Sequence, residues 1–453
     1  MSEAAQKQRS ESRLQTLARA LESGRSQHVW KMLNELHPAE IAELLESLRP
    51  AEREVVWNLV DPSHDGEVLL HVNDELRAAL IRDMDPHELV AATEGMDVDD
   101  LADLIEDLPD AVMREILRSM DKQNRHRLES VLAFTEDSAG GLMNTDAVTV
   151  RADVTLDVVL RYLRLRGDIP DLTDNLIVVN RYDKYLGTLS LSRLLTSDPA
   201  QKVSEVMERE VEPIRADMPA TKVANIFEKR DLISAPVVDE NDRLLGRITI
   251  DDVVDVIREE ADHSLMSMAG LNEETDMFAP VVASTRRRAV WLGINLLTAF
   301  LAAWVIGLFE HTLQKWVALA VLMPITASMG GIAGTQTLTI VIRGLALGQV
   351  GKTNARWLLF KEVAVGLLNG LLWALVVAAL AIAWFHNTEI GAFIGAAMII
   401  NLVCAALAGF TIPLLLRKMG IDPALAGSVI LTTITDVVGY VAFLGLATLF
   451  LMN

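Results

Sequence analysis

The last long apolar segment of the chain contains one carboxylate. Asp436 is the only acid between positions 425 and 452, and a charge at the centre of a bilayer costs roughly 2.5–3.5 kcal/mol on insertion scales. Thr432 and Thr433 lie four and three positions before it and share its helix face. No Lys, Arg or His lies deep in an apolar segment. We therefore predict that Asp436 meets a cation from solution, with a structural hydrogen bond to another segment as the alternative.

A second apolar segment contains residues that weaken a helix. Pro324 is followed by glycines, a serine and threonines before Gln336. Backbone carbonyls freed in this way are tolerated at membrane depth only against protein or a watery cavity. Gly330, Gly331 and Gly334, together with Gln336, are therefore predicted to line a cation path. The alternative is close packing of helices through small residues.

The first half of the chain has its own dense group of acids. Asp99 and Asp103 are four residues apart in its most acidic stretch, residues 97–107. Like charges at this spacing on a helix repel each other unless a cation or distance relieves them. The stretch is a candidate cation site, and a solvated helix face is the alternative.

Charge divides the chain into two parts. The 453 residues have a formal net charge of −21, yet 51% of them are hydrophobic. Residues 1–285 have a net charge of −26, and residues 286–453 one of +5. Because the acidic part would repel phosphates, we exclude nucleic acid as a partner. The single Cys404 excludes a disulfide framework and a Cys-based zinc site.

The second part is predicted to cross a membrane five times, because each apolar segment reaches the roughly 20 residues that a bilayer core requires. Basic residues gather before the first segment, between the second and third, and between the fourth and fifth. This pattern places the N-terminus in the cytoplasm and the C-terminus outside. The segments are Ala289–Phe309, Val317–Ile342, Leu358–Phe385, Ala392–Leu416 and Leu425–Met452.

Two internal repeats organise the first part. Two apolar positions recur every 12 residues, one from Leu36 to Met120, mostly followed by a capping residue or proline, and one eight residues later, from Leu44 to Leu128. This pattern is typical of short helices stacked as a superhelix. Residues 178–190 match residues 237–249, and each copy reads as strand, turn, strand and helix. This second repeat resembles a tandem pair of CBS domains, which often bind adenine nucleotides.

In CBS domains, a Ser or Thr followed three positions later by Asp holds the ribose. Thr249 and Asp252 keep this pattern, whereas Ser190 is followed by Arg193. The resemblance implies ATP as a ligand of the second copy, whereas Arg193 in the first copy argues against nucleotide binding.

The order of these parts resembles the MgtE family of bacterial magnesium channels. The most specific motifs are Met329–Gln336 and Asp422–Gly439. The resemblance implies a multidomain membrane protein with an α-superhelical N-terminal domain, α/β tandem CBS domains, a connecting helix and a five-helix transmembrane domain. The expected bounds are 1–135 for the superhelical domain, 136–262 for the CBS pair (about 138–200 and 201–262), 263–285 for the connecting helix and 286–453 for the membrane domain.

The family further implies a homodimer in the bacterial inner membrane, with the ion path between two membrane domains and closure by cytoplasmic Mg²⁺. Asp436 would be the selectivity carboxylate. Ile332 stands where the family usually has Asn, which removes a polar group from the expected path. For Asp422, which precedes a proline, an ordinary helix start is the alternative to sensing. By family position, the Mg²⁺-sensing role falls on Asp99, Asp103, Asp252, Asp255, Glu260 and Asp422.

The chemistry of the residues agrees with this resemblance. Mg²⁺ keeps several waters and binds through one or two carboxylates, and no pairing of Cys or His offers the ligands that Zn²⁺ or Cu prefers. Mn²⁺ and Co²⁺ are harder to exclude. The leading hypothesis is a Mg²⁺-selective channel or transporter, not an enzyme. The alternative is a membrane-anchored signalling or adaptor protein that contains CBS domains and conducts no ions.

Overall fold

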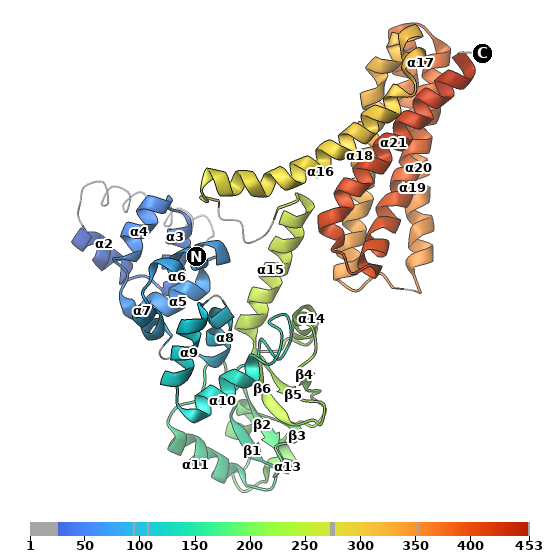
Figure 1. Cartoon of the computed structure of the whole chain (residues 1–453). Helices are drawn as coiled ribbons and strands as arrows, with labels where there is room; N and C mark the ends of the chain where they lie inside the picture. Colours follow the sequence, from blue (N-terminus) through green and yellow to red (C-terminus); the bar gives the residue numbers. More distant parts are fainter. Residues whose placement is uncertain (1–25, 94–95, 107, 272–276, 352, 452–453) are drawn as a thin grey trace. The chain divides into compact units, whose positions relative to one another are not determined.

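The computed structural model divides the chain into two compact units (Figure 1). Of the described residues, unit 1 contains those up to Asp262 and residues 277–279, and unit 2 contains residues 263–271 and those from Pro280 onward. Parts of the expected superhelical domain and connecting helix, residues 1–25 and 272–276, lie outside the described residues. The structure describes residues 26–93, 96–106, 108–271, 277–351 and 353–451.

Short helices form the first part of unit 1, and the prediction of an α-superhelical domain is confirmed. From Pro38 to Lys122 a helix begins every twelve residues. The helices are α2 (Ser26–Leu33), α3 (Pro38–Glu46), α4 (Pro50–Trp57), η1 (Pro62–His64), α5 (Asp65–His71), α6 (Asp74–Asp83), α7 (Pro86–Ala92), α8 (Val98–Glu106), α9 (Asp110–Ser119) and α10 (Lys122–Val131).

Helix starts and a recurring apolar position explain this period. Four repeats place a proline at the start of the helix, where its missing N–H costs no hydrogen bond. In two others, the Asn73 and Asp121 side chains accept hydrogen bonds from backbone N–H groups of the first turn. The eight repeated apolar residues are all buried: Leu44, Val56, Val68, Leu80, Ala92, Leu104, Ile116 and Leu128.

The CBS pair follows as two copies of one small sheet. In each copy the first strand runs parallel to the second, and the second runs antiparallel to the third. Asp183 and Asp242 occupy the same turn in the two copies, with φ of 58° and 62°. The strands are β1 (Thr149–Arg151), β2 (Asn175–Val179), β3 (Tyr185–Ser190), β4 (Ile214–Arg215), β5 (Ser234–Val238) and β6 (Leu244–Thr249).

The helices after the third strands differ between the copies. The helix after β3 has 6 residues, whereas α15 (Ile250–Met268) follows β6 and has 19. α15 therefore contains the first residues of the expected connecting segment, and the next helix begins at Val281. The other helices of the pair are α11 (Leu156–Arg166), α12 (Leu191–Thr196), α13 (Val203–Val206) and α14 (Ala220–Arg230).

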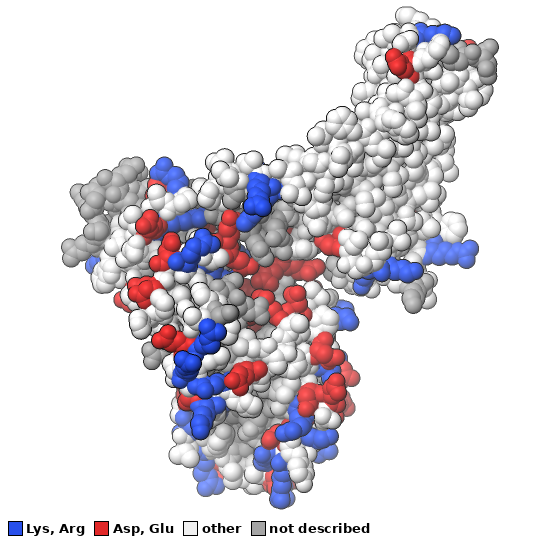
Figure 2. Space-filling view, in the orientation of Figure 1, with Lys and Arg blue, Asp and Glu red and all other residues white. Residues whose placement is uncertain are grey.

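Five described helices of unit 2 are long and apolar enough to cross a membrane, as predicted. α18 packs against α20 and α21, α19 packs against α20, and α16 packs against α21. On the face that Figure 2 shows, the surface of these helices is almost free of charge between its two ends, whereas charged side chains are spread over unit 1. The helices are α16 (Val281–Gly307), α17 (Glu310–Lys315), α18 (Val317–Ala346), α19 (Ala355–Phe385), α20 (Thr388–Lys418) and α21 (Pro423–Leu451).

The repeat offers a matched test of its buried positions. Val56 is fully buried in α4, and its neighbour Val55 is 50% exposed. Val56→Ala should lower the free energy of unfolding of unit 1 by about 2 kcal/mol, because it removes buried methyl groups and leaves a cavity. Hydrogen exchange of peptides from the superhelical domain, in the full-length protein, would measure this change. Val55→Ala is the control, and equal effects of the two substitutions would contradict the predicted period.

Candidate cation path and acidic cluster

A cavity of about 450 Å³ lies between α18 and α21. Asp436 and Thr432 line it from α21, and Gly331 and Gln336 line it from α18. The structure thus brings together four residues that the sequence analysis selected from two separate segments. The other lining residues are Ala327, Ser328, Ile332 and Thr335.

The Asp436 carboxylate is half-buried in this cavity and has no hydrogen-bond or ion-pair partner within the described ranges. The groups around it are neutral. Ser328 and Thr335 provide hydroxyls, and the Thr432 hydroxyl donates to the Ser428 carbonyl at 2.8 Å. A carboxylate with neutral oxygen neighbours suits a divalent cation that keeps part of its hydration shell.

The three glycines of α18 do not serve one purpose. Gly331 lines the cavity. Gly330 and Gly334 are instead buried against other helices. A Cβ on Gly330 would lie 2.2 Å from Asn401 Nδ2, and one on Gly334 would lie 2.9 Å from the Leu431 side chain. At these two positions the geometry matches the alternative of close helix packing. Thr433 is likewise outside the lining, and its hydroxyl donates to the Val429 carbonyl at 2.8 Å.

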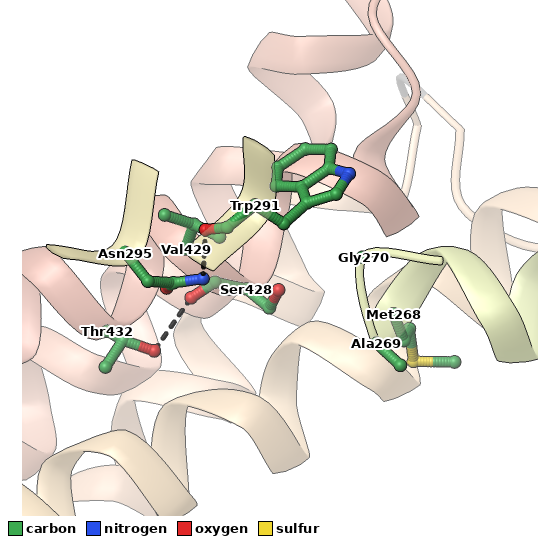
Figure 3. Close-up of a pocket in the computed structure, with 8 residues that line it drawn as sticks. All are labelled: Met268, Ala269, Gly270, Trp291, Asn295, Ser428, Val429 and Thr432. Atoms are coloured by element: carbon green, nitrogen blue, oxygen red, sulfur yellow. Dashed lines mark hydrogen bonds between the residues drawn. The ribbon is translucent and has the colours of Figure 1, made fainter. Parts of the chain in front are cut away.

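A smaller cavity of about 180 Å³ shares Thr432 with the first one. Figure 3 shows Asn295 and Trp291 of α16 and Ser428 of α21 around it, with Met268 and the residues that follow α15 on the other side. The Asn295 amide donates to the Trp291 carbonyl at 2.9 Å. The polar side chains of this cavity, Asn295, Ser428 and Thr432, therefore lie on α16 and α21.

One buried acid of unit 2 was missed by the sequence analysis. Glu362 in α19 is only 3% exposed, and its carboxylate lies 2.7 Å from Lys361 Nζ and accepts a hydrogen bond of 3.4 Å from the Thr337 hydroxyl. It is the only acid in α19, and this was the available signal.

In unit 1, acidic residues of α8 lie beside those of α15. The Asp99 side chain is 8% exposed and accepts a hydrogen bond of 3.2 Å from Asn144 Nδ2. Carboxylate oxygens of Asp97, Asp99 and Asp100 lie within 4.8 Å of one another, close enough to share a metal ion. We call these three residues, with Asp103, Asp252, Asp255 and Glu259, the acidic cluster.

Burial and mutual repulsion raise the pKa values in this cluster. Burial raises the pKa of Asp252 to about 8, and the charges of Asp99 and Asp251 contribute. Burial likewise raises the pKa of Asp99 to about 7, with contributions from Asp100 and Asp97. Carboxyl groups that are this costly to ionise together are stabilised by a divalent cation.

The rest of the cluster follows the same pattern. Burial, then the charge of Glu136, raises the pKa of Asp103 to about 7. Partial burial also raises the pKa values of Asp255 and Glu259, although both residues are exposed at the surface, and the charge of Asp255 raises the pKa of Glu259 further. Asp97, Asp100 and Glu259 were not among the predicted sensing residues, although all three belong to the acidic stretches that the sequence shows.

Two predicted sensing residues lie apart from these contacts. Glu260 is exposed on α15. Asp422 belongs to unit 2 and caps α21, where its carboxylate accepts hydrogen bonds from Ala424 N at 2.9 Å and Leu425 N at 3.2 Å. His263 Nε2 lies 3.2 Å from the same carboxylate. The geometry at Asp422 is that of a helix start with a histidine partner.

The two CBS copies differ at the expected ribose position. The Thr249 hydroxyl donates to Asp252 Oδ2 at 3.1 Å. In the first copy, Arg193 forms an ion pair with Glu208 at 2.7 Å, and its backbone N–H donates to the Ser190 hydroxyl. Only the second copy keeps the acid that would hold a ribose, and ATP binding by this copy stays a prediction.

The parts described above define a class of protein, a five-helix membrane protein with a CBS pair and an acidic helical-repeat domain. Residues 323–446 match the family described as divalent cation transporter (MgtE), and residues 36–137 match the MgtE intracellular N domain. The CBS domain family matches residues 139–199 and 203–259.

Full-length relatives specify the family. The chain is 31% identical over 441 residues to a magnesium transporter MgtE from Thermus thermophilus, and the alignment covers 96% of this chain and 98% of that relative. It is 27% identical over 431 residues to the Bacillus subtilis magnesium transporter MgtE, and that alignment covers 95% of this chain and 96% of the relative. The chain belongs to the MgtE family. A crystal structure of the cytosolic domain of the Mg²⁺ channel MgtE in complex with ATP is 33% identical, covers 54% of this chain and 99% of that chain, and has a TM-score of 0.49.

The raised pKa values predict how stability depends on pH. Each affected carboxyl keeps its proton in the folded protein well above its ordinary pKa of 3.8. The resulting stabilisation is complete below about pH 4 and is lost as the pH rises through 6 to 8. In EDTA, unit 1 of the full-length protein should therefore become easier to digest with protease between pH 5 and 9.

Mg²⁺ should reverse this change at pH 8, because it neutralises the ionised carboxylates. Asp252→Asn should weaken both the pH effect and the Mg²⁺ effect, since it removes the most strongly shifted group. Protease resistance in EDTA that rises with pH, or a Mg²⁺ effect unchanged in Asp252→Asn, would contradict the assignment.

Proposed function

We propose that this protein is a Mg²⁺-selective channel or transporter that mediates Mg²⁺ uptake. The observation that carries the proposal is the Asp436 carboxylate, which has no described protein partner and lines a cavity between two membrane helices. Relatives named as magnesium transporters match nearly the whole chain and support the choice of ion. Mn²⁺ and Co²⁺ also accept oxygen ligands, so they serve as competitors in transport assays.

The protein is proposed to lie in the bacterial inner membrane with unit 1 in the cytoplasm. Arg286, Arg287 and Arg288 precede the first apolar stretch, and Arg417 and Lys418 end α20. Basic residues of this kind mark the cytoplasmic side. In this orientation a negative membrane potential draws the cation inward, and two charges gain roughly 4.6 kcal/mol per 100 mV.

A homodimer is proposed as the working unit, following the family. One subunit offers a single Asp436 with neutral oxygens around it, whereas a path between two subunits would offer two carboxylates. Two carboxylates together with retained water are enough to hold Mg²⁺.

Cytoplasmic Mg²⁺ is proposed to close the path by binding at the acidic cluster. Shifting a gate from 1:99 to 99:1 requires about 5.5 kcal/mol of differential binding. One site at tenfold excess of ligand over its Kd provides only about 1.4 kcal/mol. Several weak sites are therefore needed, and the cluster spreads its carboxylates over α8 and α15.

An adaptor without ion flux is not favoured. Five spans are more than a membrane anchor requires. A carboxylate within a span costs roughly 2.5–3.5 kcal/mol to insert, and an anchor would gain nothing from it. The acidic cluster and the cavity are both explained by handling of a divalent cation.

The central test is Mg²⁺ influx into proteoliposomes. Asp436→Asn keeps the size of the side chain but removes its charge, so influx at a fixed membrane potential should fall about tenfold or more. Glu389→Gln is the control, since Glu389 is an exposed acid at the start of α20. If Asp436→Asn conducts Mg²⁺ as well as the wild type does, the assignment of the path is wrong.

Regulation has a separate test. Asp99→Asn and Asp252→Asn should each raise the concentration of cytoplasmic-side Mg²⁺ that halves the current, because each removes a charge that the bound cation would neutralise. Patch recordings with Mg²⁺ varied on that side measure the shift. Asp153→Asn, a substitution of an exposed acid of unit 1, should leave the half-closing concentration unchanged. Equal values in all four proteins would reject the sensing role.

A further inference from the structure

A single buried carboxamide joins the two helices that line the Asp436 cavity. Asn401 in α20 has no exposed surface. Its Nδ2 donates to the Thr326 carbonyl of α18 at 2.7 Å. Its Oδ1 has no partner among the described residues. Burying an amide costs free energy unless it is hydrogen-bonded, and the bond to Thr326 offsets part of this cost.

Both helices approach this carboxamide at a glycine. A Cβ on Gly330 of α18 would lie 2.2 Å from Asn401 Nδ2, and a Cβ on Gly439 of α21 would lie 2.8 Å from the same atom. Real Cβ atoms do not come this close, so an alanine at either position must move the helix or the carboxamide. Asn401 therefore sets the closest approach of α18 and of α21 at one point.

α18 presents the cavity on its opposite face, whereas α21 presents it next to its contact with Asn401. With 3.6 residues per turn, Thr326 and Gly330 lie on one side of α18, and Ser328 and Thr335 of the cavity lining lie on the opposite side. On α21, Gly439 is one turn from Asp436. A change in the Asn401 contacts would thus rotate or shift both walls of the cavity.

Lipid surroundings make such a contact decisive. Helices in a bilayer are not driven together by the hydrophobic effect, so close packing of small residues and interhelical hydrogen bonds determine how they fit. α18 also contains Pro324, which removes one backbone hydrogen bond and weakens the helix beside this point.

We propose that Asn401 is a positioning residue for the cation path, which fixes the spacing and rotation of α18 against α21 and hence the distance of Asp436 from the opposite wall. The inference rests on the proposed Mg²⁺ transport. Asn401 itself does not line the cavity and acts through the two helices that do.

The test is a pair of double-mutant cycles in the full-length protein, with Mg²⁺ influx into proteoliposomes as the readout. Asn401→Ala, Gly330→Ala and Gly439→Ala should each raise the KM for Mg²⁺ several-fold, up to about tenfold, by changing the geometry around Asp436. The two combinations with Asn401→Ala should each be closer to the wild type than either single variant, because the added methyl group enters the space that the carboxamide has left.

Gly445→Ala is the matched control, because a Cβ at this position of α21 meets no atom within 4 Å. It should leave the KM unchanged, alone and in the Asn401→Ala background. If Asn401→Ala is not recovered from the membrane, Asn401→Ser, which is also too short to reach Thr326, replaces it with the same expectation.

The outcomes separate this inference from the proposed function. If the wild type conducts Mg²⁺ but the effects are additive in both cycles, or if Asn401→Ala leaves the KM unchanged, the positioning role is wrong and the proposed function stands. A wild type without Mg²⁺ influx would overturn the proposed function. If the KM of each double variant returns toward the wild-type value, and no such return is seen with Gly445→Ala, the positioning role is established. General destabilisation could not produce this result, because a second destabilising substitution would add to the first.

Discussion

Charge that has been removed from water requires a partner, and this constraint organises both units of the protein. In the membrane unit it applies to Asp436, whose carboxylate lines a cavity and has no partner among the described residues. In the cytoplasmic unit it applies to the acidic cluster, where burial and repulsion favour protons over ionised carboxylates. A divalent cation is the proposed partner in both places. One site is proposed to pass the ion and the other to register its concentration, so the same chemistry serves transport and control.

The membrane unit meets this constraint with small and neutral residues. α18 combines a polar face on the cavity with a close-packed face against α20 and α21. Gly330 and Gly334 belong to the packed face, whereas Gly331 belongs to the cavity. Because its two faces differ in this way, α18 cannot rotate far about its axis without losing its packing contacts or its lining of the cavity.

Patterns in the sequence predicted most of the architecture, because repeats and apolar lengths are local signals. The twelve-residue period, the CBS pair and the five spans all appear in the structure. Asp436 was identifiable because it is the only acid in its segment. Glu362 and Asn401 were missed, and the roles of Gly330 and Gly334 stayed open, because a membrane helix is apolar on every face and its pattern does not show which side meets protein. The partners of Asp99 were equally hidden, since Asn144 and Asp252 are far from it in the sequence.

The regular spacing of the helix starts has a consequence for how the superhelical domain can change in length. From Pro38 to Lys122 each unit of twelve residues begins a new helix and adds one buried apolar residue. Inserting or deleting a few residues would put every later apolar position out of phase with its neighbours, whereas gain or loss of a whole unit would keep the phase. The length of this domain is therefore expected to vary among related proteins in steps of twelve residues, and shorter insertions should be confined to its ends.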